Sequence, residues 1–463
     1  MVIFSLDRGG ARPALLDDAS ESWLSYSELS QRVCQGAEEL KALGGKPLVF
    51  LFADNTIAAA TVYLAALQAG AAIALFPAGL ADERVAQLLE NYRPLAVFGA
   101  RVPDGYDAWD KLPAPGALLR SRFHAELHPD LALLLPTSGS TGSSKLVRLS
   151  RSAIEANAAS IAQGLSIGPG ERAALNLPIS YSYGLSVLNS HLLMGASVLL
   201  SSHGVFSREW WGRLTEHHVT SMPGVPMVYE MLARLDFDKL APPTLQTLTQ
   251  AGGALSLPLI RRFQETMAAR QGKLFIMYGQ TEATARITIL DDADLTAHFG
   301  SVGRAIAGGS ITIQSADGTT PAGEIIYRGP NVMLGYAETL ADLALGDQLH
   351  GCLATGDLGV VDAEGFLTIT GRLKRIVKIA GLRVNLDEIE AEARRMCPAA
   401  AVERSGGLVV FAETASEAEV SELRRKLLAS ALVPPTLLKV RAIAKLPTMA
   451  NGKIDLRALK DQL

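Results

Sequence analysis

The chain has 463 residues, 43 Lys and Arg side chains, 47 Asp and Glu side chains and a formal charge of −4. A chain of this length is expected to form two or three structural units around a large buried core. Its 48% content of hydrophobic residues is typical of globular proteins and excludes disorder as the dominant state. The near-neutral charge balance argues against a general nucleic-acid binder, which usually carries a strongly basic domain.

Cysteine usage indicates a reducing compartment. The three cysteines, Cys34, Cys352 and Cys397, are odd in number and far apart, and no CxxC or Cys/His cluster occurs. This pattern argues against a disulfide framework and a structural zinc site, and each cysteine is expected to be a small core residue. No basic stretch followed by an apolar one opens the sequence, so we expect no signal peptide and a cytoplasmic protein.

Up to about residue 308, short apolar runs alternate with helical patterns. Apolar residues recur every three or four positions over 26–43, which predicts a helix that buries Leu29, Val33, Ala37 and Leu40. Other helices are expected at 81–91, 151–164 and 258–269, and strands at 47–52, 131–135, 197–200 and 273–277. This alternation predicts an α/β fold with largely parallel sheets.

The stretch 57–80 is apolar enough to raise the question of a membrane span. Gln68, Gly70 and Pro77 interrupt it. We therefore predict a buried helix over 57–68, a glycine turn and a buried strand over 71–75, with no membrane span.

After residue 308, short apolar strands separated by polar turns are expected at 310–314, 324–328, 359–362 and 366–370. They predict a β-rich subdomain that completes a large N-terminal domain of several subdomains, residues 1–371. A basic segment at 371–381 and a helix over 386–397 then open a small α+β domain.

The charge is unevenly divided along the chain. Residues 372–463 carry 17 basic and 11 acidic side chains, so +6, whereas the first 371 residues carry 26 and 36, so −10. A small basic unit after a large acidic one fits a lid that must approach a polyanion. Chance sampling in a chain with many charges is the alternative explanation.

A loop dense in Ser, Thr and Gly, PTSGSTGSSK at 136–145, follows the strand expected at 131–135. It offers backbone N–H groups, hydroxyls and the Lys145 cation to a phosphate, and its glycines allow close approach. It is not a Walker A loop, because Ser144 precedes Lys145 and Leu146 follows it. Alone, the pattern fits a flexible surface connection equally well.

Six further pieces follow in order: LPISYSYGL at 177–185, QAGGAL at 250–255, YGQTEA at 278–283, TGD at 355–357, GRLKRIVKIAGLRVNLDEIE at 371–390 and ANGKID at 450–455. With the loop at 137–145, they make the chain resemble the superfamily of acyl-adenylate-forming enzymes. That superfamily includes acyl- and aryl-CoA synthetases, firefly luciferase and nonribosomal peptide synthetase adenylation domains. The resemblance covers nearly the whole chain. Ser144 and Leu146, usually Pro and often Gly in the family, depart from it, and we expect altered loop stiffness without loss of function.

The resemblance implies a two-step reaction. A carboxylate attacks the α-phosphate of ATP to give an acyl-AMP and pyrophosphate, and a thiol then attacks the acyl-AMP and releases AMP. The first step joins two anions and needs cations, Mg²⁺ and aimed backbone N–H groups. The loop that holds the β- and γ-phosphates corresponds to Thr137, Ser138, Gly139, Ser140, Thr141, Gly142 and Lys145.

The resemblance also assigns the nucleoside and the chemistry. Tyr278, beside Gly279, would stack on adenine, and Asp357 would accept hydrogen bonds from both ribose hydroxyls, with Arg372 as a second ribose contact. Gly252, Gly253 and Ala254 match the family's small residues beside the adenine, which allow the ring to come close.

Three residues would carry the adenylation step. Thr281 matches the hydroxyl that contacts the α-phosphate, and Glu282 matches the Mg²⁺ ligand. Lys453 matches a mobile catalytic lysine that bridges the substrate carboxylate and the α-phosphate oxygens.

The segment at 371–390 resembles the family's hinge and thiol-step loop. Lys374 occupies the pivot position of a hinge at 372–375, and Gly381 would lie beside the pantetheine tunnel. Rotation of a mobile C-terminal lid, residues 376–463, would replace Lys453 by this loop between the two half-reactions.

The resemblance places the acyl pocket between LPISYSYGL and YGQTEA. Tyr181 matches the gate of acyl- and aryl-CoA synthetases, with a packed core tyrosine as the alternative. Amino-acid-activating relatives carry an Asp that pairs with the substrate ammonium, and here Gly184, next to Tyr183, takes its place. Burying an unpaired ammonium is unfavourable, so an aliphatic or aromatic acid is favoured over an ordinary α-amino acid. Met277 and residues 221–229 are further pocket candidates.

The acceptor stays open between CoA and the phosphopantetheine of a separate acyl or peptidyl carrier protein, because both present the same thiol. The leading interpretation is an acid–thiol ligase that uses ATP and Mg²⁺. An adenylation-only enzyme with a non-thiol acceptor, a catalytically silent nucleotide-binding scaffold and, more remotely, a luciferase-like oxygenase are the alternatives.

Overall fold

The computed structural model describes residues 6, 9–121, 123–136, 145–315, 321–379, 382–404, 407–430, 438–449 and 453–463. The chain divides into two compact units. The first comprises Met1–Ser138, Ser143–Ser310 and Arg328–Leu353, and the second comprises Gly139–Gly142, Ile311–Tyr327 and Ala354–Leu463. Because the second unit takes in the β-rich region as well as the C-terminal residues, this division differs from the predicted boundary at 371. The hinge at 372–375 stays a prediction.

The first unit contains an eight-stranded sheet in the order β19-β9-β8-β4-β3-β5-β7-β6. Its central strands β8, β4, β3 and β5 are parallel, and the outer strands are antiparallel. The strands are β3 (Leu48–Ala53), β4 (Ala72–Pro77), β5 (Ala96–Phe98), β6 (Tyr106–Ala108), β7 (Gly116–Leu119), β8 (Leu131–Pro136), β9 (Leu146–Ser150) and β19 (Gly335–Ala337).

A nine-stranded sheet in the order β16-β15-β14-β13-β12-β10-β11-β1-β2 is the second layer of this unit. Strands β1 and β10–β14 are parallel to their neighbours within that series. The strands are β1 (Pro13–Leu16), β2 (Leu24–Ser25), β10 (Arg172–Leu175), β11 (Ser197–Leu200), β12 (Ser221–Gly224), β13 (Thr247–Gln250), β14 (Lys273–Tyr278), β15 (Thr288–Leu290) and β16 (Arg304–Ala305).

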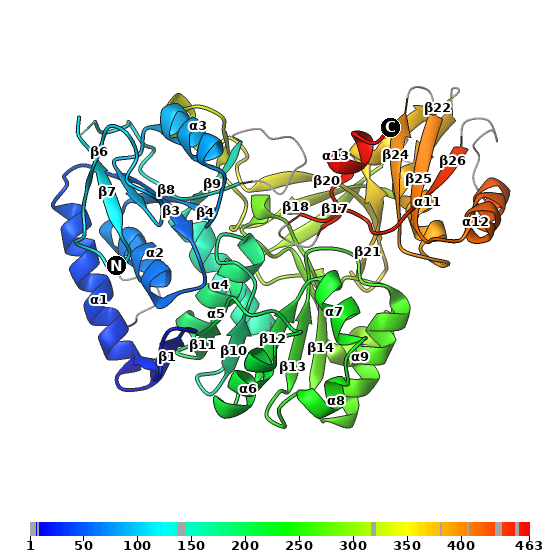
Figure 1. The fold of residues 1–463 in the computed structure, drawn as a ribbon, viewed down its shortest axis with the longest axis horizontal. Helices are drawn as coiled ribbons and strands as arrows, with labels where there is room; N and C mark the ends of the chain where they lie inside the picture. The colour runs from blue at the N-terminus through cyan, green and yellow to red at the C-terminus, as the bar shows by residue number, and fades with distance from the viewer. Residues whose placement is uncertain are drawn as a thin grey trace. The chain divides into compact units, whose positions relative to one another are not determined.

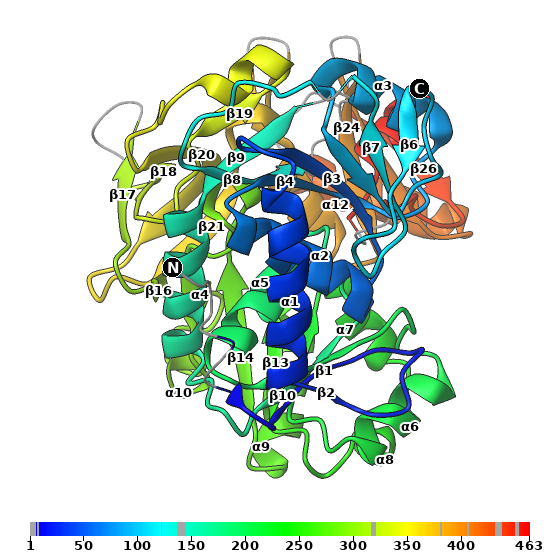
Figure 2. The ribbon, with the colours of Figure 1, turned by 90° about the vertical axis from the view of Figure 1, so that its left-hand side faces the viewer.

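Helices α1 (Tyr26–Lys41), α2 (Ile57–Ala69), α4 (Arg151–Gly164) and α5 (Ser182–Leu193) lie between these two sheets (Figures 1 and 2). Helix α2 packs on β3 and β4, and α5 packs on β10 and β11. The remaining helices of this unit are α3 (Asp82–Tyr92), α6 (Arg208–Glu216), α7 (Pro226–Leu232), α8 (Phe237–Leu240), α9 (Leu257–Ala269) and α10 (Asp292–Leu295). The predicted α/β fold with parallel-rich sheets is confirmed.

Local sequence signals explain where these helices begin and end. Helix α1 begins at a capping box, in which Ser25 accepts from the Glu28 backbone and the Glu28 carboxylate accepts from Ser25. Its predicted buried face, Leu29, Val33, Ala37 and Leu40, is confirmed. Helix α2 ends at Gly70, which adopts φ 78°, a left-handed conformation that glycine tolerates.

Helix α2 is buried nearly all round, which accounts for its apolar sequence without a membrane. In the part of the chain that the structure describes, no helix is long and apolar enough to cross a membrane.

The second unit contains a four-stranded sheet in the order β17-β18-β20-β21 and, toward the C-terminus, a β22-β23 hairpin and a β24-β25-β26 sheet. Its elements are β17 (Ser310–Gln314), β18 (Gly323–Arg328), β20 (Cys352–Val361), β21 (Leu367–Arg372), β22 (Ile376–Ile379), β23 (Leu382–Asn385), α11 (Leu386–Ala393), β24 (Ala399–Arg404), β25 (Gly407–Glu413), α12 (Glu417–Ser430), β26 (Leu438–Ile443) and α13 (Leu456–Lys460).

Alternate residues of β24 face two separate cores. Ala399 and Ala401 pack with residues of α11 and α12, whereas Ala400 and Val402 pack on the other side with Leu459 of α13. The C-terminal sheet is therefore covered on both faces, as an α+β arrangement requires.

Two local predictions are wrong. Helix α11 ends at Ala393, four residues before the predicted end at Cys397. The cysteine prediction is wrong for Cys34, which is exposed, and for Cys352, which is only partly buried, whereas Cys397 packs against the core around α11. Cys34 lies on the polar side of α1 and accepts a hydrogen bond from Gln68 at the edge of α2.

Candidate functional site

The predicted phosphate loop lies in the sequence between two paired strands. Strands β8 and β9 are antiparallel, and Pro136 lies opposite Leu146. Lys145, the last residue of the loop, therefore stands directly beside the end of β8. The loop residues Thr137, Ser138, Gly139, Ser140, Thr141 and Gly142 lie outside the described residues, and their assignment stays a prediction.

Lys145 and Glu282 both contact Tyr336, one at the ring and the other at the hydroxyl. The Tyr336 hydroxyl donates to Glu282 Oε1 at 2.9 Å, and Lys145 Nζ lies 3.7 Å from the centre of the Tyr336 ring. A looser ion pair joins Lys145 Nζ to Glu338 Oε1 at 3.9 Å. We call Lys145, Glu282, Tyr336 and Glu338 the Tyr336 cluster. It places a cation near a carboxylate, the combination that a magnesium-bound polyphosphate requires.

Strand pairing and backbone hydrogen bonds place Tyr336 there. Strand β19 pairs with β9, with Tyr336 opposite Val147. The backbone N–H of Met333 donates to the Glu282 carbonyl at 2.9 Å, which holds the segment before β19 against the turn that carries Glu282. Burial first, and then the adjacent Glu282 carboxylate, raise the pKa of Tyr336 well above that of an ordinary phenol. The hydroxyl is therefore a permanent donor at neutral pH.

The segment after β14 curls into a tight turn. A Cβ on Gly279 would lie 1.8 Å from the Ala285 carbonyl oxygen, so only glycine fits. Thr281 and Glu282 lie on a short 3-10 helix (Thr281–Ala283), and Ala285 adopts φ 110°, which strains a residue with a Cβ. The turn presents Thr281 and Glu282 side by side.

A buried asparagine holds this strained turn. Asn331 Nδ2 donates to the carbonyls of Ala283 at 2.7 Å and Arg286 at 2.9 Å. Thr284 donates in return to the Asn331 carbonyl at 2.6 Å. These bonds satisfy the freed carbonyls and stabilise the positive φ angles.

The predicted adenine segment lies against Tyr181. Gly252 has φ +86°, and a Cβ there would lie 2.7 Å from the Tyr181 hydroxyl. Gln250 closes this turn by donating to the Gly253 carbonyl at 2.8 Å, and Gly253 and Ala254 are exposed. Tyr278 is 8% exposed, and its hydroxyl accepts from Gln280. Adenine binding to these residues stays a prediction.

Tyr181 stands between this segment and an apolar cavity. It is half-buried, and its ring lies 6.5 Å from that of Tyr183 in an edge-on arrangement. Between the two tyrosines, Ser182 Oγ lies 3.3 Å from Thr281 Oγ1. The start of α5 thus carries the predicted gate and contacts the predicted catalytic hydroxyl.

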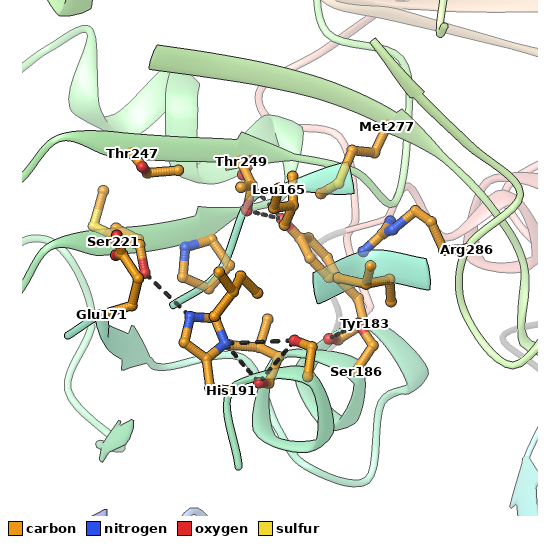
Figure 3. A pocket seen from close by; sticks show the side chains of 16 residues that line it. Leu165, Glu171, Tyr183, Ser186, His191, Ser221, Thr247, Thr249, Met277 and Arg286 are labelled. Atoms are coloured by element: carbon orange, nitrogen blue, oxygen red, sulfur yellow. Dashed lines mark hydrogen bonds between the residues drawn. The ribbon is translucent and has the colours of Figure 1, made fainter. Parts of the chain in front are cut away.

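A narrow cavity opens behind Tyr183, between α5 and strands β12, β13 and β14 (Figure 3). Of the residues predicted for the acyl pocket, Tyr183, Met277 and residues 221–223 of the range 221–229 line this cavity, and acid binding by them stays a prediction. Tyr181 and Gly184 are not among its lining residues. A Cβ on Gly184 would lie 2.3 Å from the Pro178 carbonyl oxygen, so this backbone admits no aspartate there.

His191 lies at the far end of the cavity and is neutral. Its Nδ1 donates to the Val187 carbonyl at 2.9 Å, because a carbonyl only accepts, and Nε2 faces Ser221 Oγ at 3.4 Å. Burial lowers the pKa of His191 to about 4.

Arg286 lines the same cavity and was not predicted from the sequence. It is 2% exposed, its Nε is buried without a partner, and its guanidinium lies 4.8 Å from the centre of the Tyr183 ring. A cation–π contact contributes about 1–2 kcal/mol. Burying an unpaired charge costs several kcal/mol, so the ring alone does not offset it.

Asp357 and Arg372 form an ion pair in the second unit. They lie opposite each other on β20 and β21, and Arg372 Nε is 2.9 Å from Asp357 Oδ1. Asp357 is 5% exposed, whereas the Arg372 side chain is 61% exposed. The pair holds the Asp357 carboxylate in place, and ribose binding by it stays a prediction.

The remaining predicted residues also lie in the second unit. Lys374 is the middle residue of a 3-10 turn (Leu373–Arg375), and Gly381 lies outside the described residues. The Lys453 carbonyl accepts from the Met449 N–H at 2.8 Å, and the next residue, Ile454, pairs with Thr448. The catalytic role of Lys453 stays a prediction.

Comparison with known proteins gives the family. Residues 5–337 match the family described as AMP-binding enzyme. The chain belongs to this family. It is also 30% identical, over 96% of its length and 94% of the relative's, to a (7a-methyl-1,5-dioxo-octahydro-1H-inden-4-yl)propanoyl:CoA ligase of Mycobacterium tuberculosis. The predicted resemblance to acyl-adenylate-forming enzymes is confirmed.

Two further proteins are similar to this AMP-binding enzyme. A feruloyl-CoA synthase of an Amycolatopsis species is 29% identical over 80% of this chain and 77% of its own. The structure of O-succinylbenzoate coenzyme A synthetase from Bacillus subtilis, in complex with AMP, superposes with a TM-score of 0.77 at 21% identity, covering 100% of this chain and 98% of that one. The last likeness shows the shared fold.

Proposed function

We propose that this enzyme activates a small aliphatic or aromatic carboxylic acid with ATP and Mg²⁺, releases pyrophosphate, and transfers the acyl group from acyl-AMP to the thiol of CoA. The Tyr336 cluster is the observation that supports this most directly. It holds a lysine and a carboxylate beside Thr281, in a family whose members bind AMP. Both curated relatives named above are CoA-forming ligases.

In the adenylation step, a carboxylate oxygen of the acid attacks the α-phosphorus, and the bond to the bridging oxygen breaks. Pyrophosphate leaves with that electron pair. Lys145 and the loop before it would neutralise the β- and γ-phosphates, and Glu282 would hold Mg²⁺ in the orientation set by Tyr336. Thr281 would donate to an α-phosphate oxygen, where charge develops in the transition state.

The proposal excludes ordinary α-amino acids as substrates. Arg286 lines the cavity and repels an ammonium, and the cavity's one carboxylate among the described lining residues, Glu171, already accepts from Thr220. Most of the wall is apolar, which suits an aliphatic or aromatic acyl chain.

CoA is the proposed acceptor, and a carrier-protein phosphopantetheine is the alternative. As part of the same proposal we place the reaction in the cytoplasm, because Cys34, Cys352 and Cys397 are all free thiols, which fits a reducing compartment.

Carboxylate-dependent exchange of labelled pyrophosphate into ATP tests the first step over a panel of acids. We expect exchange with small aliphatic or aromatic acids and none with α-amino acids. Adding CoA should then yield a thioester and AMP, whereas a carrier protein in place of CoA tests the alternative. If exchange occurs but neither CoA nor the carrier protein yields a thioester, the enzyme only adenylates its acid. Absence of exchange with every acid would contradict the proposal.

A further inference from the structure

We propose that Arg286 binds a second anionic group of the acid substrate, so that the preferred substrates are acids with a second carboxylate distant from the reacting one. This inference rests on the proposed function and narrows its substrate class.

The Arg286 side chain is buried, lines the cavity and has no polar partner in the part of the chain that the structure describes. No hydrogen bond or ion pair joins its guanidinium to a described residue, and its Nε is buried and unsatisfied. The guanidinium lies over the face of the Tyr183 ring, 4.8 Å from its centre (Figure 3). A buried guanidinium in this state is incomplete, because its five donors require acceptors.

The other titratable groups that face the cavity do not neutralise Arg286. Glu171 accepts from Thr220. His191 is neutral, and the Tyr183 hydroxyl is hydrogen-bonded to Thr249. An anionic group of the substrate would therefore supply the hydrogen-bond acceptors and the negative charge that the Arg286 guanidinium lacks. A carboxylate matches the guanidinium fork with two parallel hydrogen bonds.

The backbone of Arg286 is fixed, which makes its position a property of the fold. Its carbonyl accepts from Asn157 at 3.1 Å and from Asn331 at 2.9 Å. The side chain therefore extends toward Tyr183 from a clamped turn. A fixed cation is suited to select a substrate by the location of its charge.

The geometry separates the two ends of the substrate. Thr281, at the predicted reaction centre, contacts Ser182, whereas Arg286 contacts the next residue, Tyr183. A reacting carboxylate near Thr281 and a second one at Arg286 would lie on opposite sides of this Ser182–Tyr183 corner. The fitting class is a short acid with carboxylates at its two ends.

Arg148 shows how this fold treats a structural arginine. It is fully buried, and its guanidinium donates to the carbonyls of Leu334, Leu345, Gly346 and Tyr336 and to the Gln348 side chain. Arg286 has the same burial and none of these bonds. From this contrast we infer that Arg148 stabilises the fold and that Arg286 binds a ligand.

Matched pairs of acids test the proposal: hexanoate against adipate, and 3-phenylpropanoate against 3-(4-carboxyphenyl)propanoate. We expect kcat/KM for pyrophosphate exchange to favour the diacid of at least one pair by about 10-fold or more, as for a charge-assisted bond. Arg286→Met should remove or invert this preference, and Arg286→Lys should retain part of it. Equal kcat/KM values for both members of each pair, or an equal loss for both in Arg286→Met, would overturn the proposal.

Thermal unfolding separates this role from a structural one. Arg148→Met should lower Tm strongly, whereas Arg286→Met should keep or raise it, because it removes an uncompensated buried charge. A fall in Tm for Arg286→Met as large as for Arg148→Met would contradict the ligand assignment.

If no acid supports pyrophosphate exchange, the proposed function is wrong. Binding of adipate then tests the anion site at Arg286 independently. Adipate should then raise the Tm of the wild type and not that of Arg286→Met. Absence of this difference would overturn the anion site as well.

Discussion

Tyr336 is the residue that brings Lys145 and Glu282 into one site. Tyr336→Phe removes the hydroxyl that donates to Glu282 and keeps the ring beneath Lys145. We expect the Mg²⁺ requirement to rise and adenylation to slow about 10-fold, since an outer-shell partner orients a metal ligand. Pyrophosphate exchange over a Mg²⁺ titration measures both effects.

Tyr336→Leu is the matched control, because it also removes the ring contact with Lys145. It should lose more activity than Tyr336→Phe, and its KM for ATP should rise further. An unchanged Mg²⁺ dependence in Tyr336→Phe would refute the orienting role of the hydroxyl.

His191 provides a prediction about pH. Burial lowers its pKa to about 4 from an ordinary 6.5, so the folded state binds its proton less tightly than the unfolded state. The contribution of neutral, buried His191 to the free energy of unfolding is fully present above about pH 6.5. It is lost as the pH falls toward 4, by up to about 3 kcal/mol. Denaturant unfolding of the wild type and of His191→Asn should show this slope in the wild type alone. Parallel curves for the two proteins would contradict it.

At the residue scale, motifs predicted part of the site. The sequence pieces located Lys145, Glu282 and Tyr183, because each lies in a continuous pattern. Tyr336 and Arg286 lie outside such patterns. Tyr336 acquires its role from the pairing of β19 with β9, and Arg286 from a strained turn held by Asn331, so neither carries a local signal.

At the scale of elements, two arginine ion pairs lie at the two ends of the segment predicted to be a hinge. Arg372 is paired with Asp357 on β20. Arg375 is paired with Asp387 and Glu390 on α11, and the Glu390 carboxylate also accepts from the Ala401 N–H of β24. Both ends of the predicted hinge are therefore anchored to different elements. We infer that a pivot lies between these anchors, at residues 373–374.

Lys374→Pro tests this pivot. Proline restricts φ at this residue and disfavours the helical conformation of the residue before it. We expect adenylation to persist and thioester formation to fall at least about 10-fold, whereas Lys374→Ala should retain both steps. A normal rate of thioester formation in the proline variant would remove the support for a pivot here.

Most of the elements that periodicity predicted agree with the structure to within one or two residues, and β20 shows the limit of this approach. Its first half, from Cys352, was not predicted, because the polar TGD piece interrupts the apolar alternation. Strand pairing decides this segment instead. Asp357 lies opposite Arg372, Gly356 adopts φ 71°, and the register shifts between Leu358 and Gly359. Such irregular pairing depends on the partner strand, which single-sequence patterns do not contain.

At the scale of the whole molecule, the sequence predicted a large N-terminal part and a smaller basic one. The described fold forms two compact units, and the second also contains the β17-β18-β20-β21 sheet. This compact division reflects contacts between segments that are distant in sequence, whereas the prediction used charge and sequence pattern, and the predicted domain boundary at 371 stays a prediction. The C-terminal sheet has a core on each face, as expected of a lid that moves as one body.

The division of labour between the two parts is tested at Lys453. This residue lies in a C-terminal segment, 372–463, with a net charge of +6. If its ammonium bridges the acid and the α-phosphate, Lys453→Ala should slow adenylation about 10²- to 10³-fold. Transfer from supplied acyl-AMP to CoA should change little, because that step forms no new contact between the two anions.

Lys460→Ala is the control that isolates this effect from overall charge. Lys460 is an exposed residue of α13 in the same unit, and its removal lowers the charge of the segment by the same amount. We expect it to leave both half-reactions near wild-type rates. Equal losses in the two variants would assign the effect to the electrostatic field of the basic segment. Equal losses of both half-reactions in Lys453→Ala would instead show that this lysine does not act in adenylation alone.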